Sequence, residues 1–167
     1  DKHTRREDIK EIITFLNRKY PESNLNYINM LSNYEKEDLW GKEIEYQIDN
    51  NGLILKPVVL PYDMYLYLKI RNEVFIKEQN IDSKIELNDI EEKSSYPFLI
   101  KYQNECIGTI RYRFLNDEIK IERFAVLKKY RSKGLGRKVF LFFVNMLKHK
   151  YNPCTITFNA QSYLKDF

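Results

Sequence analysis

Residues Ile121–Lys138 read IERFAVLKKYRSKGLGRK, with an apolar stretch, a basic loop and an apolar helix in succession. The N–H groups of a helix's first turn lack intrahelical acceptors, and the helix dipole is positive at that end. Gly134 and Gly136 let a ligand come close to the backbone. Four cations lie beside them: Arg131, Lys133, Arg137 and Lys138. The segment is therefore typical of a diphosphate-binding helix N-terminus.

This junction matches neither of the two common phosphate-binding motifs. It lacks the G-x-x-x-x-G-K-[ST] pattern of a P-loop and the G-x-G-x-x-G pattern that follows the first strand of a dinucleotide-binding fold. Two glycines and four cations also fit a helix N-terminus that binds no ligand, so the pattern alone leaves that alternative open.

The segments on either side of the junction predict a sheet. Apolar stretches at residues 98–102, 106–114 and 118–127 are separated by short turns, which favours an antiparallel meander. A helix over residues 134–150 and a strand over residues 155–159 follow. A strand–helix–strand connection that closes a meander predicts an α+β fold, with a mixed, mostly antiparallel sheet and helices on both faces.

The N-terminal part predicts a helix and a hairpin. Thr4 and Glu7 form a capping-box pattern, and the apolar residues after them recur at helical spacing until Pro21. An Asp-Asn-Asn-Gly turn separates two strand-like stretches at residues 43–48 and 53–60.

Further helices are predicted in the middle and at the end of the chain. Proline is favoured at the first helical position, so Pro61 opens a long helix that ends near Gln79. Residues 81–95 are acidic and predict a loop. Residues 25–31 and the residues from Ser162 onward predict only short helices.

Composition limits the class of protein. The chain has 167 residues, 43% hydrophobic and 31% charged, with a net charge of +4. No apolar run approaches the roughly 20 residues of a membrane span, and the first residues are charged, unlike a signal peptide. Lysines and arginines are spread along the chain, so nucleic acid is not an expected partner. These features predict a soluble, cytoplasmic protein without membrane partners.

The cysteines and histidines predict neither disulfides nor a metal site. Cys106 and Cys154 lie in apolar, strand-like surroundings, where a free cysteine behaves as a small hydrophobic residue. His3 and His149 are far apart in the sequence and belong to no Cys/His cluster. We therefore expect no metal and a reducing, intracellular compartment.

Three motifs carry a family resemblance. Arg131–Gly136, RSKGLG, resembles the [QR]-x-x-G-x-[GA] acetyl-CoA motif of the GNAT superfamily of N-acetyltransferases, and Phe124–Val126 looks like the bulged fourth strand of that fold. RNEVFIKEQN at Arg71–Asn80 is similar to the R-x-x-V-F-x-x-E-Q-x helix of the ElaA-like branch. The acidic stretch after it, and NAQSYLKDF at residues 159–167, match the same branch.

The resemblance covers residues 53–167 and leaves residues 1–52 as an N-terminal helical extension with one strand. Family members usually continue with a tyrosine that protonates the leaving thiolate and then a two-stranded hairpin. This sequence stops at Phe167, one residue before that position, so we expect a C-terminally truncated domain without the hairpin. The uncovered edge of the last strand would then favour a homodimer.

The resemblance implies where acetyl-CoA binds. Its pantetheine arm would lie between two parallel strands that a bulge splays apart, paired with the backbone of Phe124, Ala125 and Val126. A bulge N–H, that of Phe124 or Val126, would stabilise the developing oxyanion by about 3 kcal/mol. The other predicted coenzyme-binding residues are Arg131, Ser132, Lys133, Gly134, Leu135, Gly136, Arg137 and Gln161. Gln161 stands where many family members have asparagine.

The resemblance also implies residues for the acceptor. Glu122 would take the proton of the attacking amine as a general base, or anchor the acceptor electrostatically. The alternative is a carboxylate that only pairs with Arg123 or Arg111. Glu78 and Gln79 are expected to shape the acceptor cavity, with packing at a helix end as the alternative.

Three functions remain after these observations. The first is an acetyl-CoA-dependent N-acetyltransferase that acts on a small primary amine, such as an amino sugar phosphate, a polyamine or an amino-acid-like metabolite. The second is a non-catalytic acyl-CoA-binding regulatory module. The third, a nucleic-acid-binding protein that uses the basic helix at residues 5–19, is the least favoured because that helix also carries acids.

Overall fold

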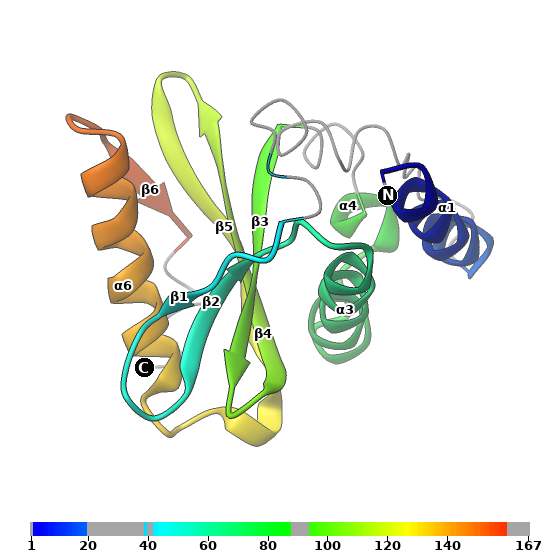
Figure 1. Cartoon of the computed structure of the whole chain (residues 1–167), viewed down its shortest axis with the longest axis horizontal. Coiled ribbons are helices and arrows are strands. Elements are labelled where there is room, and N and C mark those ends of the chain that lie inside the picture. Colours follow the sequence, from blue (N-terminus) through cyan, green and yellow to red (C-terminus); the bar gives the residue numbers. More distant parts are fainter. Residues whose placement is uncertain (1, 20–38, 40–41, 88–93, 160–167) are drawn as a thin grey trace.

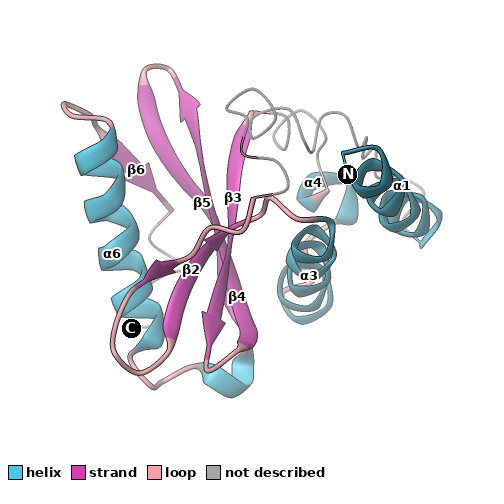
Figure 2. Ribbon diagram, in the orientation of Figure 1, coloured by secondary structure: helices cyan, strands magenta, loops and turns pink. Residues whose placement is uncertain are grey.

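The chain folds around one sheet (Figure 1, Figure 2). The computed structural model describes residues 2–19, 39, 42–87 and 94–159. The elements in this part are α1 (Lys2–Lys19), β1 (Tyr46–Gln47), β2 (Leu53–Pro57), α3 (Pro61–Arg71), η1 (Asn72–Glu78), α4 (Ser83–Glu86), β3 (Ser95–Tyr102), β4 (Glu105–Leu115), β5 (Glu118–Val126), η2 (Lys128–Tyr130), α6 (Leu135–Lys150) and β6 (Ile156–Phe158). The segment η1 is a π-helix that continues α3, and η2 is a single 3₁₀ turn.

Within the described residues, six strands form a sheet in the order β1-β2-β3-β4-β5-β6. Neighbouring strands are antiparallel except β5 and β6, which are parallel. Parallel strands need a crossover connection, and α6 supplies it. The mixed, mostly antiparallel sheet confirms the predicted α+β class.

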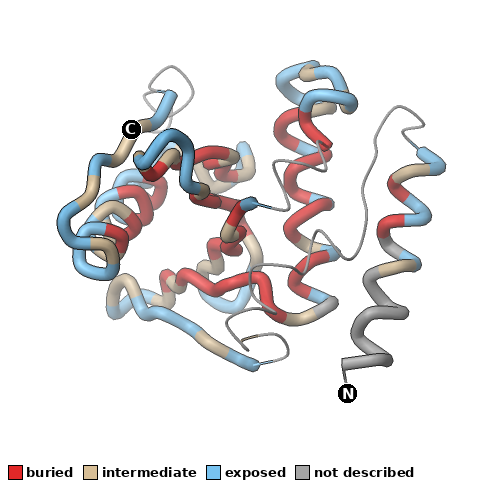
Figure 3. Tube along the Cα trace, turned by 90° about the horizontal axis from the view of Figure 1, so that it is seen from above, coloured by how far each residue is buried: buried red, intermediate tan, exposed pale blue. Residues whose placement is uncertain are grey.

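Helices cover both faces of this sheet, as predicted. The helix α6 packs on one face, α3 and η1 pack on the other, and α1 packs against α3 on the side away from the sheet (Figure 1). Side chains alternate between the faces: in β3, Phe98 and Ile100 join the cluster under α6, while Leu99 between them joins the cluster under α3. The buried residues gather between these layers (Figure 3).

Most predicted elements are present with shifted ends. The meander is β3–β5, the helix predicted from Pro61 is α3 with η1, and the helix predicted over residues 134–150 is α6. The first helix begins at Lys2, so Thr4 lies inside α1 and not at the predicted N-cap position. The predicted helices over residues 25–31 and from Ser162 lie outside the described residues.

Two local predictions were wrong in extent. The strand expected over residues 43–48 is reduced to Tyr46–Gln47, which pairs with β2 at one edge of the sheet. The acidic segment expected to be a loop contains α4. The side chain of Asp82 accepts a hydrogen bond from the N–H of Lys84 and so caps this helix. Because Asp82 lies in an acidic segment, its capping role was not recognised in the sequence.

The two cysteines behave as expected. Cys106 and Cys154 are free and half-buried, and they pack against the two opposite apolar clusters.

Of the helices that the structure describes, none has the length and apolar character that crossing a membrane requires.

The strands β4 and β5 approach each other closely at Gly108. A Cβ atom at this position would overlap the carbonyl oxygen of Ala125 and lie 3.1 Å from Cδ1 of Ile100. Only glycine therefore allows this spacing between β4 and the strand that carries the candidate site.

We expect Gly108→Ala to lower the free energy of unfolding by about 2 kcal/mol, because the backbone of β5 would have to move to make room. Urea unfolding followed by circular dichroism measures the change. Cys106→Ala is the matched control, since it alters the same strand without adding atoms. A Gly108→Ala protein as stable as the parent would contradict the close approach of the two strands.

Candidate active site

The strand β5 contains a bulge at Arg123. On β4, Thr109 pairs with Ala125 and Arg111 pairs with Glu122, so β5 has one residue more than β4 in this interval. Arg123 has a φ of +53°, in the left-handed region that residues other than glycine seldom adopt. The hydroxyl of Thr109 donates a hydrogen bond of 2.8 Å to the carbonyl oxygen of Arg123. The bulge predicted for this strand is therefore present.

The extra residue changes which side chains face each side of the sheet. Before the bulge, Ile119 and Ile121 belong to the cluster under α6; after it, Phe124 and Val126 do. The residues that face α6 thus have odd numbers before the bulge and even numbers after it. This change is expected when one residue is inserted into a strand whose side chains alternate between the two faces. Glu122, between these two sets, points to the opposite face.

The described pairing between β5 and β6 ends just before the bulge. Their parallel pairing joins Ile119–Ile121 to Ile156–Phe158 and extends no further among the described residues. N–H groups alternate between the two edges of a strand, and the N–H of Leu127 donates to the carbonyl of Ile107 on β4 at 2.7 Å. The N–H of Val126 therefore points away from β4, to the edge along which β6 pairs with residues 119–121.

An open pocket of about 230 Å³ lies at the bulge, where β5 meets η1 and α4. Its apolar lining residues are Phe75, Ile81, Ile85, Ile121 and Phe124, and its polar ones are Gln79, Glu86, Lys120, Glu122, Arg123 and Asn159. The structure thus brings Gln79 and Glu122 together at one pocket.

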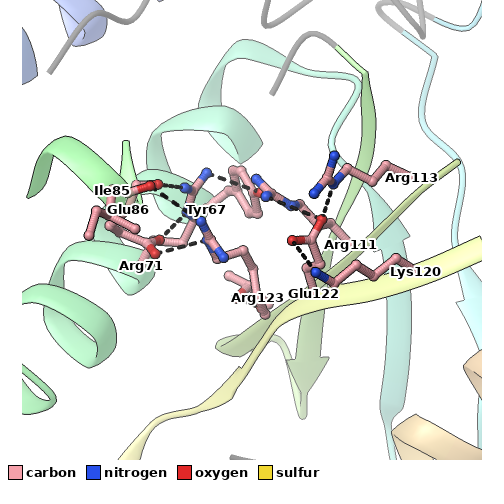
Figure 4. Close-up of polar contacts among 10 residues, drawn as sticks. Tyr67, Arg71, Ile85, Glu86, Arg111, Arg113, Lys120, Glu122 and Arg123 are labelled. Atoms are coloured by element: carbon pink, nitrogen blue, oxygen red, sulfur yellow. Dashed lines mark hydrogen bonds and ion pairs between the residues drawn. The ribbon is translucent and has the colours of Figure 1, made fainter. Parts of the chain in front are cut away.

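Glu122 is buried, with 8% of its side chain exposed, and three cations surround its carboxylate (Figure 4). Arg113 donates to Oε1, Nη2 of Arg111 lies 3.5 Å from the same oxygen, and Nζ of Lys120 lies 3.9 Å from Oε2. Burial raises the pKa of Glu122, but the guanidinium groups, first that of Arg111 and then that of Arg113, outweigh it and hold the pKa below its ordinary value. Glu122 is therefore ionised at neutral pH.

A second buried carboxylate, that of Glu86 on α4, lines the same pocket (Figure 4). Its Oε1 lies 2.6 Å from Nε of Arg71, and its Oε2 lies 2.8 Å from Nε of Arg123. Arg71, itself fully buried, also donates to the Glu86 carbonyl and, at 3.2 Å, to the hydroxyl of Tyr67. These contacts connect α3, α4 and β5.

Glu78 does not line this pocket. Its carboxylate accepts two hydrogen bonds from the guanidinium of Arg131, at 2.7 and 2.5 Å, and this contact lowers the pKa of Glu78. Nε of Arg131 also donates to the carbonyl of Val126 at 2.7 Å. Consecutive helical residues point in different directions, so Gln79 lines the predicted acceptor cavity while Glu78 joins η1 to the glycine loop.

The glycine loop leaves open space at the start of α6. Gly134 has a φ of +77° at the N-cap position, and a Cβ atom there would meet nothing within 4 Å. Lys133 and Arg137 are exposed on either side, and the exposed Lys138 lies 3.4 Å from the carboxylate of Asp49. An anion could therefore approach the first turn of α6 closely.

The other predicted coenzyme-binding residues are placed as follows. Phe124, Ala125 and Val126 are buried in β5, Ser132 is exposed in the loop, and Leu135 and Gly136 are buried in the first turn of α6. Gln161 lies outside the described residues. The N–H of Arg131 donates to the carbonyl of Lys128 at 3.2 Å, so both its amide and its guanidinium bind protein groups.

Four charged residues of the site were not predicted: Arg71, Glu86, Arg113 and Lys120. Strand alternation could have found two of them, because Arg113 shares a face with Arg111, and Lys120 shares a face with Glu122. Glu86 had no such signal, since its partners come from distant parts of the chain. Among the residues with described positions, no cluster of three or more His, Cys, Asp or Glu side chains could hold a metal ion.

Comparisons with known proteins agree with this fold. The model of the acetyltransferase (GNAT) family matches residues 64–162, more than half of the chain, which therefore belongs to that family. ElaA from Escherichia coli shares the fold, with a TM-score of 0.51 and 22% identity over 62% of this chain and 72% of ElaA. An acyl-CoA N-acyltransferase from Pseudomonas aeruginosa has a TM-score of 0.53 and 17% identity, with the same coverage. The predicted family is confirmed.

Two relatives come from Bacillus subtilis. The uncharacterized protein YyaT is 31% identical over 98 residues, 58% of this chain and 66% of YyaT. The uncharacterized N-acetyltransferase YjcF is 38% identical over 68 residues, 40% of this chain and 47% of YjcF. The match thus spans less than two thirds of the length of either curated relative.

We expect Glu122→Gln to destabilise the fold by about 3 kcal/mol at pH 7, because Arg111 and Arg113 lose their carboxylate partner. A folded-state pKa below the ordinary value means that this stabilisation is complete above about pH 5 and is lost as the pH falls through the lowered pKa. Urea unfolding of both proteins between pH 7 and pH 3 measures the difference.

Glu73→Gln is the control, since Glu73 forms only an exposed pair with Lys77 and should show no measurable effect. A parent–variant difference for Glu122 that persists undiminished at pH 3, or that disappears by pH 6, would contradict the assignment.

Proposed function

We propose that this chain transfers an acetyl group from acetyl-CoA to a primary amine of a small molecule. One observation carries the proposal: the Arg123 bulge in β5 lies beside a pocket, just past the described pairing with β6, and the same strand leads into the glycine loop at the start of α6. A coenzyme bound along this strand would present its thioester at the pocket. Membership of the GNAT acetyltransferase family supports this reading.

The coenzyme would lie along the edge of β5 that faces away from β4, past the described pairing with β6. Phe124 and Val126 are two residues apart, so their N–H groups point to the same edge. They would pair with the pantetheine arm, and one of them would stabilise negative charge on the thioester oxygen. The diphosphate would bind N–H groups of residues 132–137. We assign a different role to Arg131, whose guanidinium and amide already bind protein groups.

The transfer balances without a further reactant. The amine nitrogen attacks the thioester carbonyl carbon, a C–N bond forms, the C–S bond breaks, and the electron pair leaves on sulfur. The amine loses one proton, and the thiolate gains one from solvent. A thiol pKa near 8.5 makes the thiolate an adequate leaving group at neutral pH.

Glu122 would act chiefly as the anionic partner of the acceptor amine. An effective general base titrates near the pH of the reaction, whereas cations hold the pKa of Glu122 below that of an ordinary carboxyl. The ionised carboxylate can still accept a hydrogen bond from the amine, directly or through water. Gln79 lines the same pocket and could orient the acceptor.

The charges around the pocket favour one class of acceptor. Among the described residues, the two acids Glu86 and Glu122 are paired with five cations: Arg71, Arg111, Arg113, Lys120 and Arg123. An excess of positive charge repels a polyamine and attracts an amine that also carries a phosphate or carboxylate. Amino sugar phosphates and amino-acid-like metabolites therefore fit better than polyamines.

A non-catalytic acyl-CoA-binding module is the second candidate. The contacts of Glu122 with three cations favour it, because they give this carboxylate a structural role that needs no turnover. Both candidates bind the coenzyme. Only the transferase releases a thiol in the presence of an amine.

We expect Gly134→Val to raise the Kd for acetyl-CoA at least tenfold, about 1.4 kcal/mol, because the side chain would fill the space beside the loop. Titration calorimetry measures the Kd. Gly52→Val is the control for backbone strain, since Gly52 also has a positive φ, +89°, but lies in the β1–β2 turn. Unchanged affinity in a folded Gly134→Val protein would remove the loop from the site.

Thiol release from acetyl-CoA with a panel of amines tests the reaction. We expect phosphate- or carboxylate-bearing amines to react faster than polyamines, and Glu122→Gln to lower kcat about 10²-fold with little change in coenzyme Kd. Because Glu122 stays ionised near neutral pH, kcat/KM of both proteins should rise with pH as the acceptor amine loses its proton.

Each other outcome of this assay has a definite meaning. Coenzyme binding without amine-dependent thiol release would favour the regulatory module. An unchanged kcat in Glu122→Gln would reduce Glu122 to its structural role.

A further inference from the structure

The bulge in β5 is held from two sides. Thr109 binds the carbonyl oxygen of Arg123, as described above, and the Arg123 side chain reaches α4. There its Nε lies 2.8 Å from Oε2 of Glu86, and Nη2 donates to the carbonyl of Ile85 at 3.5 Å (Figure 4). Arg123, which adopts a left-handed conformation within β5, thus also has a side chain that contacts α4.

The partner of Arg123 is itself firmly anchored. Glu86 is 1% exposed and binds Arg71, which is fully buried in α3 and also contacts Tyr67. The hydrogen bonds from Arg71 to Glu86 are charge-assisted and buried, so they hold Glu86 more firmly than an exposed ion pair would. The ion pair with Glu86 therefore keeps the Arg123 side chain close to α3.

We propose that Arg71, Glu86 and Arg123 form a clamp that keeps the β5 bulge in place, and that Glu86 and Arg123 are positioning residues for acetyl transfer. The inference rests on the proposed function. A left-handed conformation is unfavourable for arginine, and such conformations persist where the surroundings over-determine them. The contact with Glu86 provides such a constraint at Arg123, the residue in the left-handed conformation.

Loss of the bulge would alter both halves of the site. The residue inserted at Arg123 lets Glu122 point to the α3 side while Phe124, which also borders the pocket, and Val126 join the apolar cluster under α6. A relaxed strand would shift one of these sets to the wrong face. The clamp thus acts on the reaction through the backbone of β5 and needs no contact with the acceptor.

Two substitutions at Arg123 separate this role from direct acceptor binding. Arg123→Ala removes the clamp and leaves a residue that disfavours the left-handed conformation. Arg123→Gly removes the same guanidinium but tolerates that conformation. Both leave Glu86 paired with Arg71, so no buried carboxylate is left without a cation. Lys77→Ala, which removes a cation from an exposed pair, is the control.

We expect Arg123→Ala to lower kcat at least tenfold, and Arg123→Gly to be at least fivefold more active than Arg123→Ala. Lys77→Ala should match the parent. Equal losses in the two Arg123 variants would overturn the proposal and assign the guanidinium to the acceptor. Parent-like activity in Arg123→Ala would overturn it as well.

Hydrogen exchange tests the clamp without measuring turnover. Its result is therefore informative even if the chain transfers no acetyl group. We expect the peptide covering residues 118–127 to exchange at least tenfold faster in Arg123→Ala and in Glu86→Gln than in the parent. The β3 peptide, residues 95–102, should be unchanged. Parent-like exchange of the β5 peptide in folded Arg123→Ala would overturn the clamp itself.

Discussion

The candidate site depends on the bulge in β5, where this strand has one residue more than β4. Arg123 adopts a left-handed conformation, and the parity of the strand changes across it. The apolar positions on the α6 side change from odd to even, while Glu122 faces the pocket. The pairing with β6 ends at the same place. A single inserted residue thus lies beside a pocket that a carboxylate lines, in agreement with the frequent occurrence of bulges beside active sites.

The buried carboxylates beside the bulge are compensated by cations. Isolated buried carboxylates would be strongly unfavourable, but Glu86 and Glu122 each lie among guanidinium groups on neighbouring elements. The two networks differ in what they connect. That of Glu122 joins β4 to β5 within the sheet, whereas that of Glu86 joins the sheet to α3 and α4. The pocket is therefore both polar and held in place by its surroundings.

After the C-terminal end of β5, the cations of the glycine loop have different roles. Arg131 belongs to the motif that resembles a coenzyme site, yet its side chain joins Glu78 to the carbonyl of Val126. The open backbone at Gly134 and the exposed Lys133 and Arg137 remain available to an anion. In this arrangement Arg131 keeps the loop against the strand, and residues further along can meet a phosphate.

Local signals in the sequence determined the α+β class, the meander, the helix from Pro61 and the glycine loop, because periodicity, proline position and turn residues act over a few neighbouring positions. Strand alternation in the sequence also predicts that Lys120 and Glu122 lie on the same face of the sheet. Only the tertiary structure decided that Glu86 meets Arg123 and that Glu78 turns away from the pocket toward Arg131. The physical reason is that ion pairs form between elements far apart in the chain, and their partners follow from how helices pack on the sheet, which no local pattern specifies.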